Sequence, residues 1–367
     1  MRLAIVNLTA GGLSGGYRSY LRNLVPRLAA DSSVTALRVL VPPTGAGDPG
    51  VQAWPEAVVR HPARWIRRNL DEFAPDVVFV PTARRFRFHS VPTVTMVRNM
   101  ESLLRPVRGN PLPAALRNLA RRELARRACR DAARVIAVSG FVRDFLVEHW
   151  RLPAEGVSVV PHGVSQDIPP DTLRPPPGLD GMTDDSWLFT AGSIRPARGL
   201  EDVLGAVALL NAGGRNLRLV IAGEADPATR RFAARLKRDA RAMGIDEQVH
   251  WLGRVDAAEM GWCFRHSGAF VMTSRVEACP ITVLEAMAHG ALSISTDQPP
   301  MPEFFGGAAA YYPAADARAL AERIDATLAL GVADRARARD AARQRARAFT
   351  WDRTADATIA ALRSVLT

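Results

Sequence analysis

Lysine is nearly absent from this sequence. Lys237 is the single lysine, whereas lysine and arginine together number 48, so arginine carries almost all of the positive charge. The segment Ala225–Met243 around it is arginine-rich, is predicted to be helical and lies away from the glycine-rich motifs. Enzymes that hold pyridoxal phosphate need a Schiff-base lysine. The position of Lys237 therefore argues against that class.

Cysteine is also scarce, and its placement excludes two further kinds of site. Cys129, Cys263 and Cys279 are odd in number and widely scattered, which fits neither a disulfide framework nor a metal knuckle. The sequence has no Asp-x-Asp motif and no cluster of His, Cys and Asp with ligand spacing. We therefore expect free thiols, no metal and no cofactor.

Long apolar runs are missing too. No stretch approaches the roughly 18 uncharged apolar residues of a membrane-spanning helix. Met1–Leu8 is too short for the core of a signal peptide and predicts a first strand. With 48% hydrophobic residues in a chain of 367, two well-packed domains are possible. We expect a soluble protein that stays in the cytoplasm.

Positive charge is concentrated in one part of the chain. The net charge is +11, and the segment Arg84–Arg130 holds twelve arginines against Glu101 and Glu123. Such a cluster suits an anionic membrane surface or nucleic acid. Phe86 and Phe88 are its only aromatic residues, which disfavours nucleic acid as the partner. We expect peripheral contact with an anionic membrane, and a solvated basic surface is the alternative.

Apolar, β-branched runs alternate with helical stretches along the whole chain, which is the pattern of doubly wound parallel sheets. Their nearly continuous hydrophobicity predicts strands that are buried on both faces. In the first half the expected strands are Leu3–Leu8, Leu37–Val41, Val77–Val80, Thr93–Val97, Val135–Val138 and Val157–Val160. In the second half they are Trp187–Ala191, Leu217–Ala222, His250–Leu252, Ala269–Thr273, Leu292–Ser295 and Ala309–Tyr312.

A proline-rich stretch separates the two halves. Gln166–Gly178 contains five prolines in thirteen residues, so it cannot be a central strand or a helix interior. Open α/β sheets bind ligands at the carboxyl ends of their strands, which predicts a site in a cleft between two domains. The predicted organisation is an N-terminal domain at 1–165, a linker at 166–185, a C-terminal domain at 186–350 and a helix at 351–367 that can cross back to the first domain.

The first strand is followed by a glycine-rich turn, Gly11–Gly16, and by a predicted helix at Tyr17–Ala29. Glycines allow the backbone to approach a ligand, and the start of a helix favours an anion. The spacing differs from the dinucleotide fingerprint, and Val39–Pro43 offers no acidic residue for a ribose. The pattern therefore disfavours a nicotinamide cofactor, and a flexible turn is the alternative interpretation.

A second glycine turn, Gly192–Gly199, carries two arginines three residues apart at the end of a predicted strand. The guanidinium groups of Arg195 and Arg198 can clamp a diphosphate there and hold the charge that is released as it leaves. Surface arginine is the alternative, but the order of strand, glycine turn and helix favours a phosphate site.

Two carboxylates, Glu277 and Glu285, lie eight positions apart across one apolar segment. Pro280 fits the first position of a helix, whose unpaired N–H groups suit a phosphate. Glu277 would then lie in the loop above the phosphate, and Glu285 further along the helix. Both can accept hydrogen bonds there from hydroxyls of a nucleotide sugar.

Shorter motifs at predicted strand ends complete the set. Ile221–Glu224 and Trp251–Val255 suit contacts with a nucleotide base and ribose, and Glu303 follows another strand. Val160–Val164, with His162, ends the first domain in a turn. Each motif is weak alone, and the order of the motifs carries the information.

In this order, the motifs of the second half resemble the retaining glycosyltransferases of family 4, the group 1 type with the GT-B fold. The resemblance runs from Gly192 to Glu303. The first half is similar to the acceptor domain of that family more loosely, through its glycine-rich turn, Val135–Ser139 and Pro161–Val164. The resemblance implies two doubly wound, Rossmann-like domains that face each other across a cleft.

The resemblance also implies roles for individual residues. Arg195 and Arg198 would hold the donor diphosphate and Glu277 would contact the donor sugar, so these three are the expected catalytic residues. Glu285 would bind the ribose, and backbone N–H groups near the start of its helix would support the phosphates. The expected donor-binding set is Gly12, Gly192, Gly223, Gly253, Pro280, Ile281, Thr282, Glu285 and Glu303.

Two departures from the family pattern alter this assignment. The family's usual Gly-Arg-Leu is Gly192-Ser193-Ile194 here, so Arg195 is expected to act as the second cation. Where the family often has a His after the fourth strand, this chain has Val97–Met100. Arg98 and Asn99, together with His162, are therefore the expected residues on the acceptor side.

The expected function is a metal-independent, retaining transfer of a sugar from a nucleotide diphosphate sugar, such as a UDP-sugar or GDP-sugar, to a glycan or lipid-linked acceptor in polysaccharide biosynthesis. Two alternatives stay open. One is a nucleotide-sugar epimerase of the same fold, and the other is a non-enzymatic basic protein that binds anionic membrane or nucleic acid.

Overall fold

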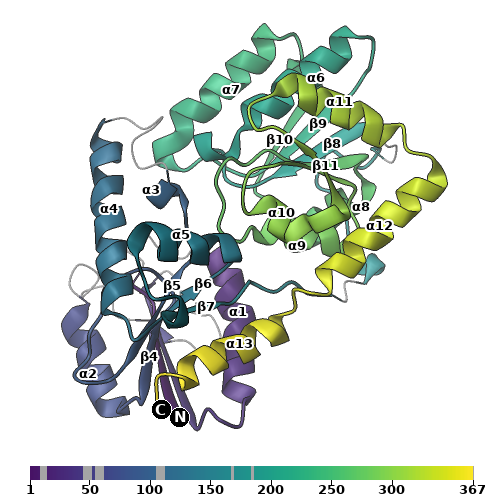
Figure 1. The fold of residues 1–367 in the computed structure, drawn as a ribbon. Helices are drawn as coiled ribbons and strands as arrows, with labels where there is room; N and C mark the ends of the chain where they lie inside the picture. The colour runs from purple at the N-terminus through teal and green to yellow at the C-terminus, as the bar shows by residue number, and fades with distance from the viewer. Residues whose placement is uncertain are drawn as a thin grey trace. The chain divides into compact units, whose positions relative to one another are not determined.

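The chain forms two compact units, each built on its own parallel sheet (Figure 1). Unit 1 consists of Met1–Gly163 and Trp351–Thr367, and unit 2 is Val164–Thr350. The computed structural model describes residues 1–8, 15–43, 52–53, 62–104, 112–166, 169–182 and 186–366.

The sheet of unit 1 has seven strands in the order β3-β2-β1-β4-β5-β6-β7, and all of its pairings are parallel. Its strands are β1 (Arg2–Val6), β2 (Ala36–Val41), β3 (Gln52–Ala53), β4 (Val77–Val80), β5 (Thr93–Val97), β6 (Arg134–Ala137) and β7 (Val157–Val159). Its helices are α1 (Gly15–Ala30), α2 (Ala63–Phe73), α3 (Glu101–Leu104), α4 (Leu112–Asp131), α5 (Gly140–Trp150) and α13 (Trp351–Arg363).

The sheet of unit 2 has six parallel strands in the order β10-β9-β8-β11-β12-β13. Its strands are β8 (Trp187–Ala191), β9 (Arg218–Ala222), β10 (Val249–Gly253), β11 (Ala269–Met272), β12 (Ser293–Thr296) and β13 (Ala309–Tyr312). Its helices are α6 (Leu200–Ala212), α7 (Arg230–Ala242), α8 (Ala257–His266), α9 (Ile281–Ala288), α10 (Met301–Phe305), α11 (Ala317–Leu328) and α12 (Val332–Ala346).

Both sheets confirm the doubly wound fold that the sequence predicts. Central strands such as β4, β5, β8 and β11 are buried along their whole length, as expected for strands covered on both faces. All twelve predicted strands are present, with ends that shift by a residue or two. The structure adds the strand β3, which the sequence did not predict. It consists of two residues, Gln52 and Ala53, and contains no apolar run.

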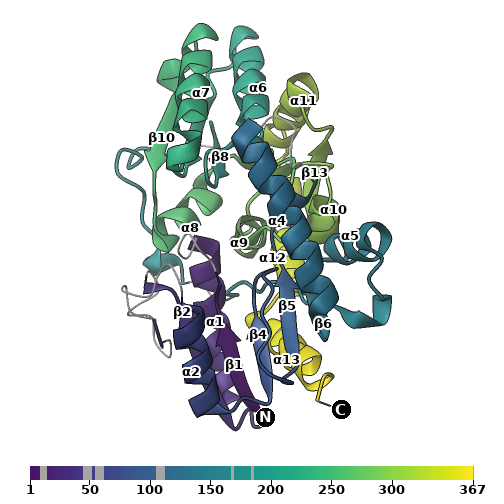
Figure 2. The same cartoon turned by 90° about the vertical axis from the view of Figure 1, so that its left-hand side faces the viewer.

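The last helix, α13, belongs to unit 1 and packs on α1 (Figures 1 and 2). The hydroxyl of Thr354 donates to the backbone oxygen of Pro161 at 2.9 Å, and Arg27 of α1 pairs with Asp352 at 2.6 Å. The predicted return of the C-terminal helix to the first domain is therefore confirmed.

The proline-rich segment that follows unit 1 packs on unit 2 where the structure describes it. Leu179 and Met182 are buried, and Arg174 pairs with Asp256 at the start of α8. Prolines keep this segment out of regular strands and long helices, and it contains one short 3-10 turn, Pro170–Thr172. The chain divides into units after Gly163, and this segment is part of unit 2.

Among the helices that the structure describes, none combines the length and the apolarity needed to cross a membrane.

Candidate functional site

Strands β8 and β11 of unit 2 are neighbours in the sheet although β9 and β10 come between them in the chain. Connections from such neighbours run to opposite sides, and open α/β sheets bind their ligands beyond the carboxyl ends of the strands at this point. The loops here are 192–199 after β8 and 273–280 after β11. Both carry residues that the sequence predicts for a diphosphate site.

Glycines shape the edge of the sheet at this point. Gly223 follows β9 with φ +139°, and a Cβ atom there would lie 2.0 Å from the backbone oxygen of Gly192. Gly192 has φ +136°, and a Cβ atom on it would lie 2.6 Å from Cζ of Arg198. The N–H of Gly223 donates to the oxygen of Gly253 at 2.7 Å. Three predicted glycines therefore lie together, and the Arg198 side chain lies in the space that Gly192 leaves open.

Arg198 and Glu277 form an ion pair across the two loops. Nη1 of Arg198 lies 2.7 Å from Oε1 of Glu277, and these side chains are 14% and 13% exposed. The same Nη1 donates to the hydroxyl of Ser274 at 3.0 Å. Because both partners are largely buried, the pair fixes the guanidinium at the carboxyl ends of β8 and β11. Arg195 is partly buried and precedes Arg198 in the same turn, where its backbone oxygen accepts from the N–H of Arg198.

Backbone oxygens of the Arg198 turn are fastened to the loop after β11. The hydroxyl of Thr273 donates to the backbone oxygen of Arg198 at 2.6 Å. The N–H of Arg275 donates to the backbone oxygen of Ala197 at 2.8 Å. These two bonds hold the turn in place from the β11 side.

A buried carboxylate strengthens this attachment. Oδ1 of Asp202, in the first turn of α6, accepts from Arg275 at 2.8 Å, and the Asp202 side chain is 4% exposed. Its Oδ2 accepts from the Tyr312 hydroxyl at 3.2 Å and from the N–H of Ala315 at 2.9 Å. Asp202 therefore ties β13 and the β11 loop to the helix that continues from the Arg198 turn.

Helix α9 begins at the end of the second loop. Pro280 has extended backbone and precedes the helix, which starts at Ile281. The predicted start near Pro280 is thus shifted by one residue. The first N–H within the helix to find a backbone partner is that of Val283, which donates to Pro280 at 3.0 Å. The N–H groups of Ile281 and Thr282 precede this bond, and unpaired N–H groups at the start of a helix suit an anion.

Glu285 lies on the half-buried face of α9 together with Ile281 and Thr282, one turn beyond the helix start. Burial raises the pKa of the Glu285 carboxyl to about 7. The carboxyl group is therefore present in both protonation states near neutral pH. A ligand that donates hydrogen bonds to it would favour the ionised form.

Glu303 lies in α10, which is held from α12. Arg345 donates from Nη2 to the backbone oxygen of Glu303 at 2.6 Å and from Nε to that of Phe304 at 2.8 Å. The arginine thereby satisfies carbonyl groups of a short helix and fixes its position after β12.

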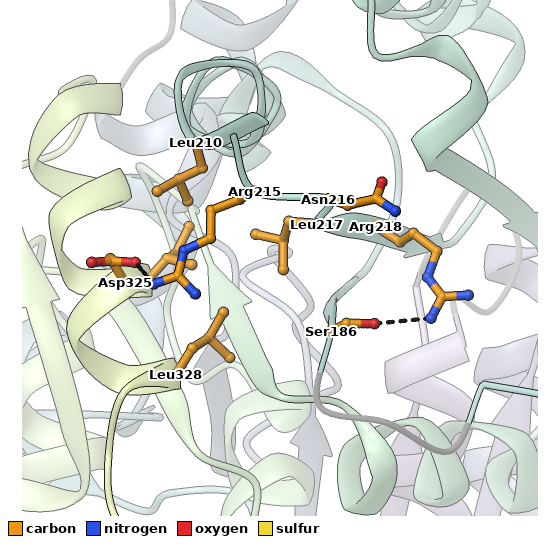
Figure 3. A pocket seen from close by; sticks show the side chains of 9 residues that line it. Ser186, Leu210, Arg215, Asn216, Leu217, Arg218, Asp325 and Leu328 are labelled. Carbon is orange, nitrogen blue, oxygen red and sulfur yellow. Dashed lines mark hydrogen bonds and ion pairs between the residues drawn. The ribbon is translucent and has the colours of Figure 1, made fainter. Parts of the chain in front are cut away.

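A cavity of about 700 Å³ lies at the opposite, amino edge of the same sheet (Figure 3). Ser186 precedes β8 and Arg218 begins β9, and Nη2 of Arg218 donates to the Ser186 hydroxyl at 2.9 Å. Arg215 pairs with Asp325 across the same space. The two arginines that line this cavity, Arg215 and Arg218, already have partners. Open α/β sheets bind their ligands at the carboxyl edge, so this cavity is not the expected site.

Over the residues described, no group of three His, Cys, Asp or Glu side chains could hold a metal ion. Cys129, Cys263 and Cys279 form no disulfide with one another, and all three are buried. Burial raises the pKa of the Cys129 and Cys263 thiols to about 12, so both are inert at neutral pH.

Family models match both halves of the chain. Residues 181–345 match the model described as glycosyl transferases group 1, and residues 14–167 match the model for glycosyltransferase family 4. The chain belongs to the group 1 and family 4 glycosyltransferases. The match to the first model contains the whole Arg198–Glu277 site.

Two curated relatives resemble part of this chain. The lipopolysaccharide 1,2-N-acetylglucosaminetransferase of Salmonella typhimurium is 28% identical over 47% of this chain and 46% of its own length. The mannosylfructose-phosphate synthase of Agrobacterium fabrum is 23% identical over 46% of this chain and 38% of its own. The matching part thus spans less than half the length of these relatives.

Solved structures share the fold over nearly the whole chain. The Anabaena HepE protein in complex with UDP and glucose has a TM-score of 0.76 at 15% identity, with 99% of this chain and all of that chain covered. A glycosyltransferase from Rickettsia africae has a TM-score of 0.75 at 17% identity and covers 100% and 99% of the two chains. At such identities the similarity shows the fold alone, which is the predicted GT-B fold.

The residues expected on the acceptor side are Arg98, Asn99 and His162. All three lie in unit 1, in different environments. Cζ of Arg98 lies 3.7 Å from the ring centroid of Tyr17. Asn99 is exposed, and its side-chain oxygen accepts from the N–H of Glu101 at the start of α3. Gly12, predicted for the donor, lies outside the described residues.

His162 is buried in unit 1 among aromatic rings. Its ring centroid lies 5.0 Å from that of Tyr20 and 6.4 Å from that of Trp351. Burial, with a smaller contribution from Arg98, lowers the pKa of His162 to about 3. His162 is therefore neutral at physiological pH and takes part in the packing of α1 against α13.

Sequence reasoning missed Thr273, Ser274, Arg275 and Asp202, which hold Arg198 and its turn. Arg275 and Asp202 are single charged residues at a loop and at a helix start, and each alone has an ordinary surface interpretation. Thr273 ends a predicted strand, and that position was the available signal, because side chains directly after a strand lie at the binding edge.

The arginine-rich segment is partly neutralised where it is described. Glu123 pairs with Arg126 at 2.9 Å and with Arg127 at 2.8 Å, and Asp131 pairs with Arg85 and Arg87. Helix α4 also exposes the large apolar side chains of Leu116, Leu119 and Leu124, with exposed fractions of 60%, 42% and 50%. Arg117 and Arg121 are exposed beside them.

Proposed function

We propose that the protein transfers a sugar from a nucleotide diphosphate sugar to a glycan or lipid-linked acceptor, with retention at the anomeric carbon and without a metal ion. The observation that carries this proposal is the buried Arg198–Glu277 pair beside the start of α9, at the β8–β11 junction. A guanidinium and free helix N–H groups at one place suit a diphosphate. Structural neighbours crystallised with UDP and with UDP-glucose support the donor class.

The proposed chemistry needs charge stabilisation more than covalent help from the protein. As the bond between the anomeric carbon and the diphosphate breaks, negative charge grows on the phosphate oxygens. Arg195, Arg198 and the N–H groups of Ile281 and Thr282 stabilise that charge. The acceptor hydroxyl attacks from the face that the diphosphate leaves, and a phosphate oxygen takes its proton. Glu277 orients the sugar hydroxyls, and Glu285 accepts from the ribose.

A thermal-shift panel tests the donor assignment. Purified protein is heated with UDP, GDP, ADP and with neutral UDP- and GDP-sugars, and a specific ligand raises the unfolding midpoint in proportion to its affinity. We expect one nucleotide family to give a clear shift that Arg198→Ala abolishes. No shift with any nucleotide diphosphate would contradict the proposal.

Product analysis separates the reaction from its alternatives. The anomeric configuration of the product, compared with that of the donor, tests retention. Conversion of the donor sugar without an acceptor would indicate an epimerase instead. Activity that survives exhaustive treatment with a chelator is expected for a metal-independent enzyme, and its loss, with recovery on adding a divalent ion, would contradict that part.

We also propose that α4 contacts an anionic membrane surface, where a lipid-linked acceptor would lie. Leu116 and Leu124 on the exposed side of the helix supply apolar contact, and Arg117 and Arg121 supply attraction to anionic headgroups. Co-sedimentation with vesicles containing anionic lipid should fall at least about fivefold in the double variant Leu116→Ser/Leu124→Ser. Leu209 of α6, which is 46% exposed, provides the control Leu209→Ser, which should bind normally. Binding to RNA in place of vesicles would contradict the assignment.

A further inference from the structure

Arg98 is a cation that has no carboxylate partner among the residues that the structure describes. It follows β5 directly, at the carboxyl edge of the unit 1 sheet, and its side chain is half-buried. Its guanidinium lies over an aromatic ring, since Cζ is 3.7 Å from the centroid of Tyr17. Residues 9–14, which precede α1 in the chain, contain no acidic residue in the sequence. Among the described residues of unit 1, no carboxylate therefore compensates this charge.

The groups around Arg98 add hydrogen-bond donors and no negative charge. Tyr17 is completely buried, and its hydroxyl has no hydrogen-bond partner within the described residues. Burial keeps this phenol protonated, because it raises the pKa of Tyr17 above its ordinary value. Tyr17 is also the third residue of α1, so the N-terminal N–H groups of a sixteen-residue helix lie in the same turn.

Removing a guanidinium from water without pairing it is unfavourable. Burial accordingly lowers the pKa of Arg98 from its ordinary value. Contact with an aromatic face offsets a part of this cost, and an oxyanion would offset more of it, because charge-assisted hydrogen bonds are the stronger interaction. A neutral sugar hydroxyl would leave the charge uncompensated.

We propose that unit 1 binds an oxyanion on the acceptor, a phosphate or a carboxylate, through Arg98, the Tyr17 hydroxyl and the start of α1. This inference rests on the proposed function and narrows its acceptor to an anionic glycan or glycolipid. Arg98 positions the acceptor through a group that does not react, so its contribution is to binding and to orientation of the attacking hydroxyl.

The first test measures binding to the full-length protein by calorimetry, with UDP present at saturation so that the Arg198 site is filled. The probes are inorganic phosphate and glucose 6-phosphate, and glucose is the neutral control. We expect Arg98→Gln to weaken both anionic probes at least about tenfold, and Arg98→Lys to retain an intermediate affinity. Arg64→Gln, at an exposed position on α2, removes the same charge and should leave both affinities unchanged.

A stability measurement separates ligand binding from a structural role. Arg98→Met removes a charge that no carboxylate of the described residues pairs, so its unfolding midpoint without ligand should equal or exceed that of the wild type. Phosphate should raise the midpoint of the wild type and not that of Arg98→Met. A residue with a purely structural role would instead lower the midpoint when replaced, and that result would overturn the inference.

A donor arm distinguishes the source of the anion. Wild type and Arg98→Gln are compared for binding of UDP-glucose and UDP-glucuronate. Equal affinities in the two proteins support an anion on the acceptor, whereas a selective loss of UDP-glucuronate would overturn it in favour of a donor carboxylate. Failure of UDP itself to bind would contradict the proposed function, and UDP binding without Arg98-dependent phosphate binding would contradict this inference alone.

Discussion

Arg198 in unit 2 and Arg98 in unit 1 occupy comparable places in their own sheets. Each lies at the carboxyl edge of a parallel sheet, close to the end of a buried strand. Arg198 is paired with Glu277 at 2.7 Å and hydrogen-bonded to Ser274, whereas Arg98 lies over the ring of Tyr17 and has no carboxylate partner in the part of the chain that the structure describes. The same kind of side chain is therefore in an ion pair in unit 2 and in contact with an aromatic ring in unit 1.

A paired and an unpaired guanidinium place different requirements on the ligand. A paired guanidinium has its geometry fixed before the ligand arrives, and such preorganisation is what stabilisation of a developing charge needs. An unpaired guanidinium depends on a ligand that brings its own negative charge. In our proposal, the reacting diphosphate therefore binds to unit 2, and an anion on the acceptor binds to unit 1.

The largest effect is expected from breaking the pair in unit 2. Arg198→Ala should lower kcat/KM by roughly 10²–10³-fold and should weaken UDP as well, because it removes a donor that acts on the leaving group. Glu277→Ala and Glu277→Gln should lower turnover strongly and leave the affinity for UDP unchanged. Both changes remove the carboxylate that fixes Arg198 and keep the guanidinium that binds UDP. Steady-state kinetics and calorimetry measure the two quantities separately.

The control for this pair is Arg215→Ala at the opposite edge of the unit 2 sheet, where the Arg215–Asp325 pair is half-exposed. Its kinetics should match those of the wild type. Wild-type product formation by both Arg198→Ala and Glu277→Ala would sink the assignment of the site.

A second effect tests whether glycine geometry supports the unit 2 site. In Gly223→Ala the new Cβ would lie 2.0 Å from the backbone oxygen of Gly192, so the turn beside Arg198 must move. Gly214 also has positive φ, +93°, but a Cβ atom there meets nothing within 4 Å. We expect Gly214→Ala to cost about 1 kcal/mol of unfolding free energy and Gly223→Ala to cost more. Equal losses in chemical denaturation would show that the close contact is relaxed easily.

A third effect concerns Asp202, the buried carboxylate behind the Arg198 turn. Asp202→Asn removes the charge that accepts from Arg275, so a partly buried guanidinium loses its partner. We expect a loss of roughly 2–4 kcal/mol in unfolding free energy, together with lower kcat, because the turn is no longer held. The double variant Asp202→Asn/Arg275→Met should recover part of the stability, and a double-mutant cycle quantifies the coupling.

The smallest effect is a dependence on pH. The folded pKa of Glu285, about 7, lies above its ordinary value of 4.5, so the folded state binds more protons than the unfolded chain between these values. The stability contributed by this group is fully present below about pH 4.5 and is lost as the pH rises through about 7. Relative to the wild type, Glu285→Gln should therefore raise the unfolding midpoint more at pH 8 than at pH 5.

The same carboxyl should couple nucleotide binding to protons. If the ionised form accepts from the ribose, UDP binding at pH 7 releases protons, which calorimetry in buffers of different ionisation enthalpy detects. Proton release that persists in Glu285→Gln would assign the titration to another group.

Much of this architecture follows from the sequence because buried parallel strands consist of apolar runs with little else in them. The strand β3 escapes that reasoning, since its two residues, Gln52 and Ala53, have no pattern. The glycine turns and Arg198 are also visible in the sequence, because a glycine directly after a strand has few other uses.

The partners of these residues are not visible in the sequence. The pairing of Arg198 with Glu277 depends on the order of β8 and β11 in the sheet, which brings distant segments together. Asp202 at a helix start and Arg275 in a loop are common residues in common places. That no described carboxylate lies beside Arg98 is also a result of the packing of unit 1.

The most direct test of the account is a crystal structure of the protein with UDP bound. We predict that the diphosphate lies within hydrogen-bond distance of Arg198 and the N–H groups of Ile281 and Thr282, and that the ribose hydroxyls lie on Glu285. A nucleotide bound instead in the cavity between Arg215 and Arg218, at the amino edge of the sheet, would contradict the account.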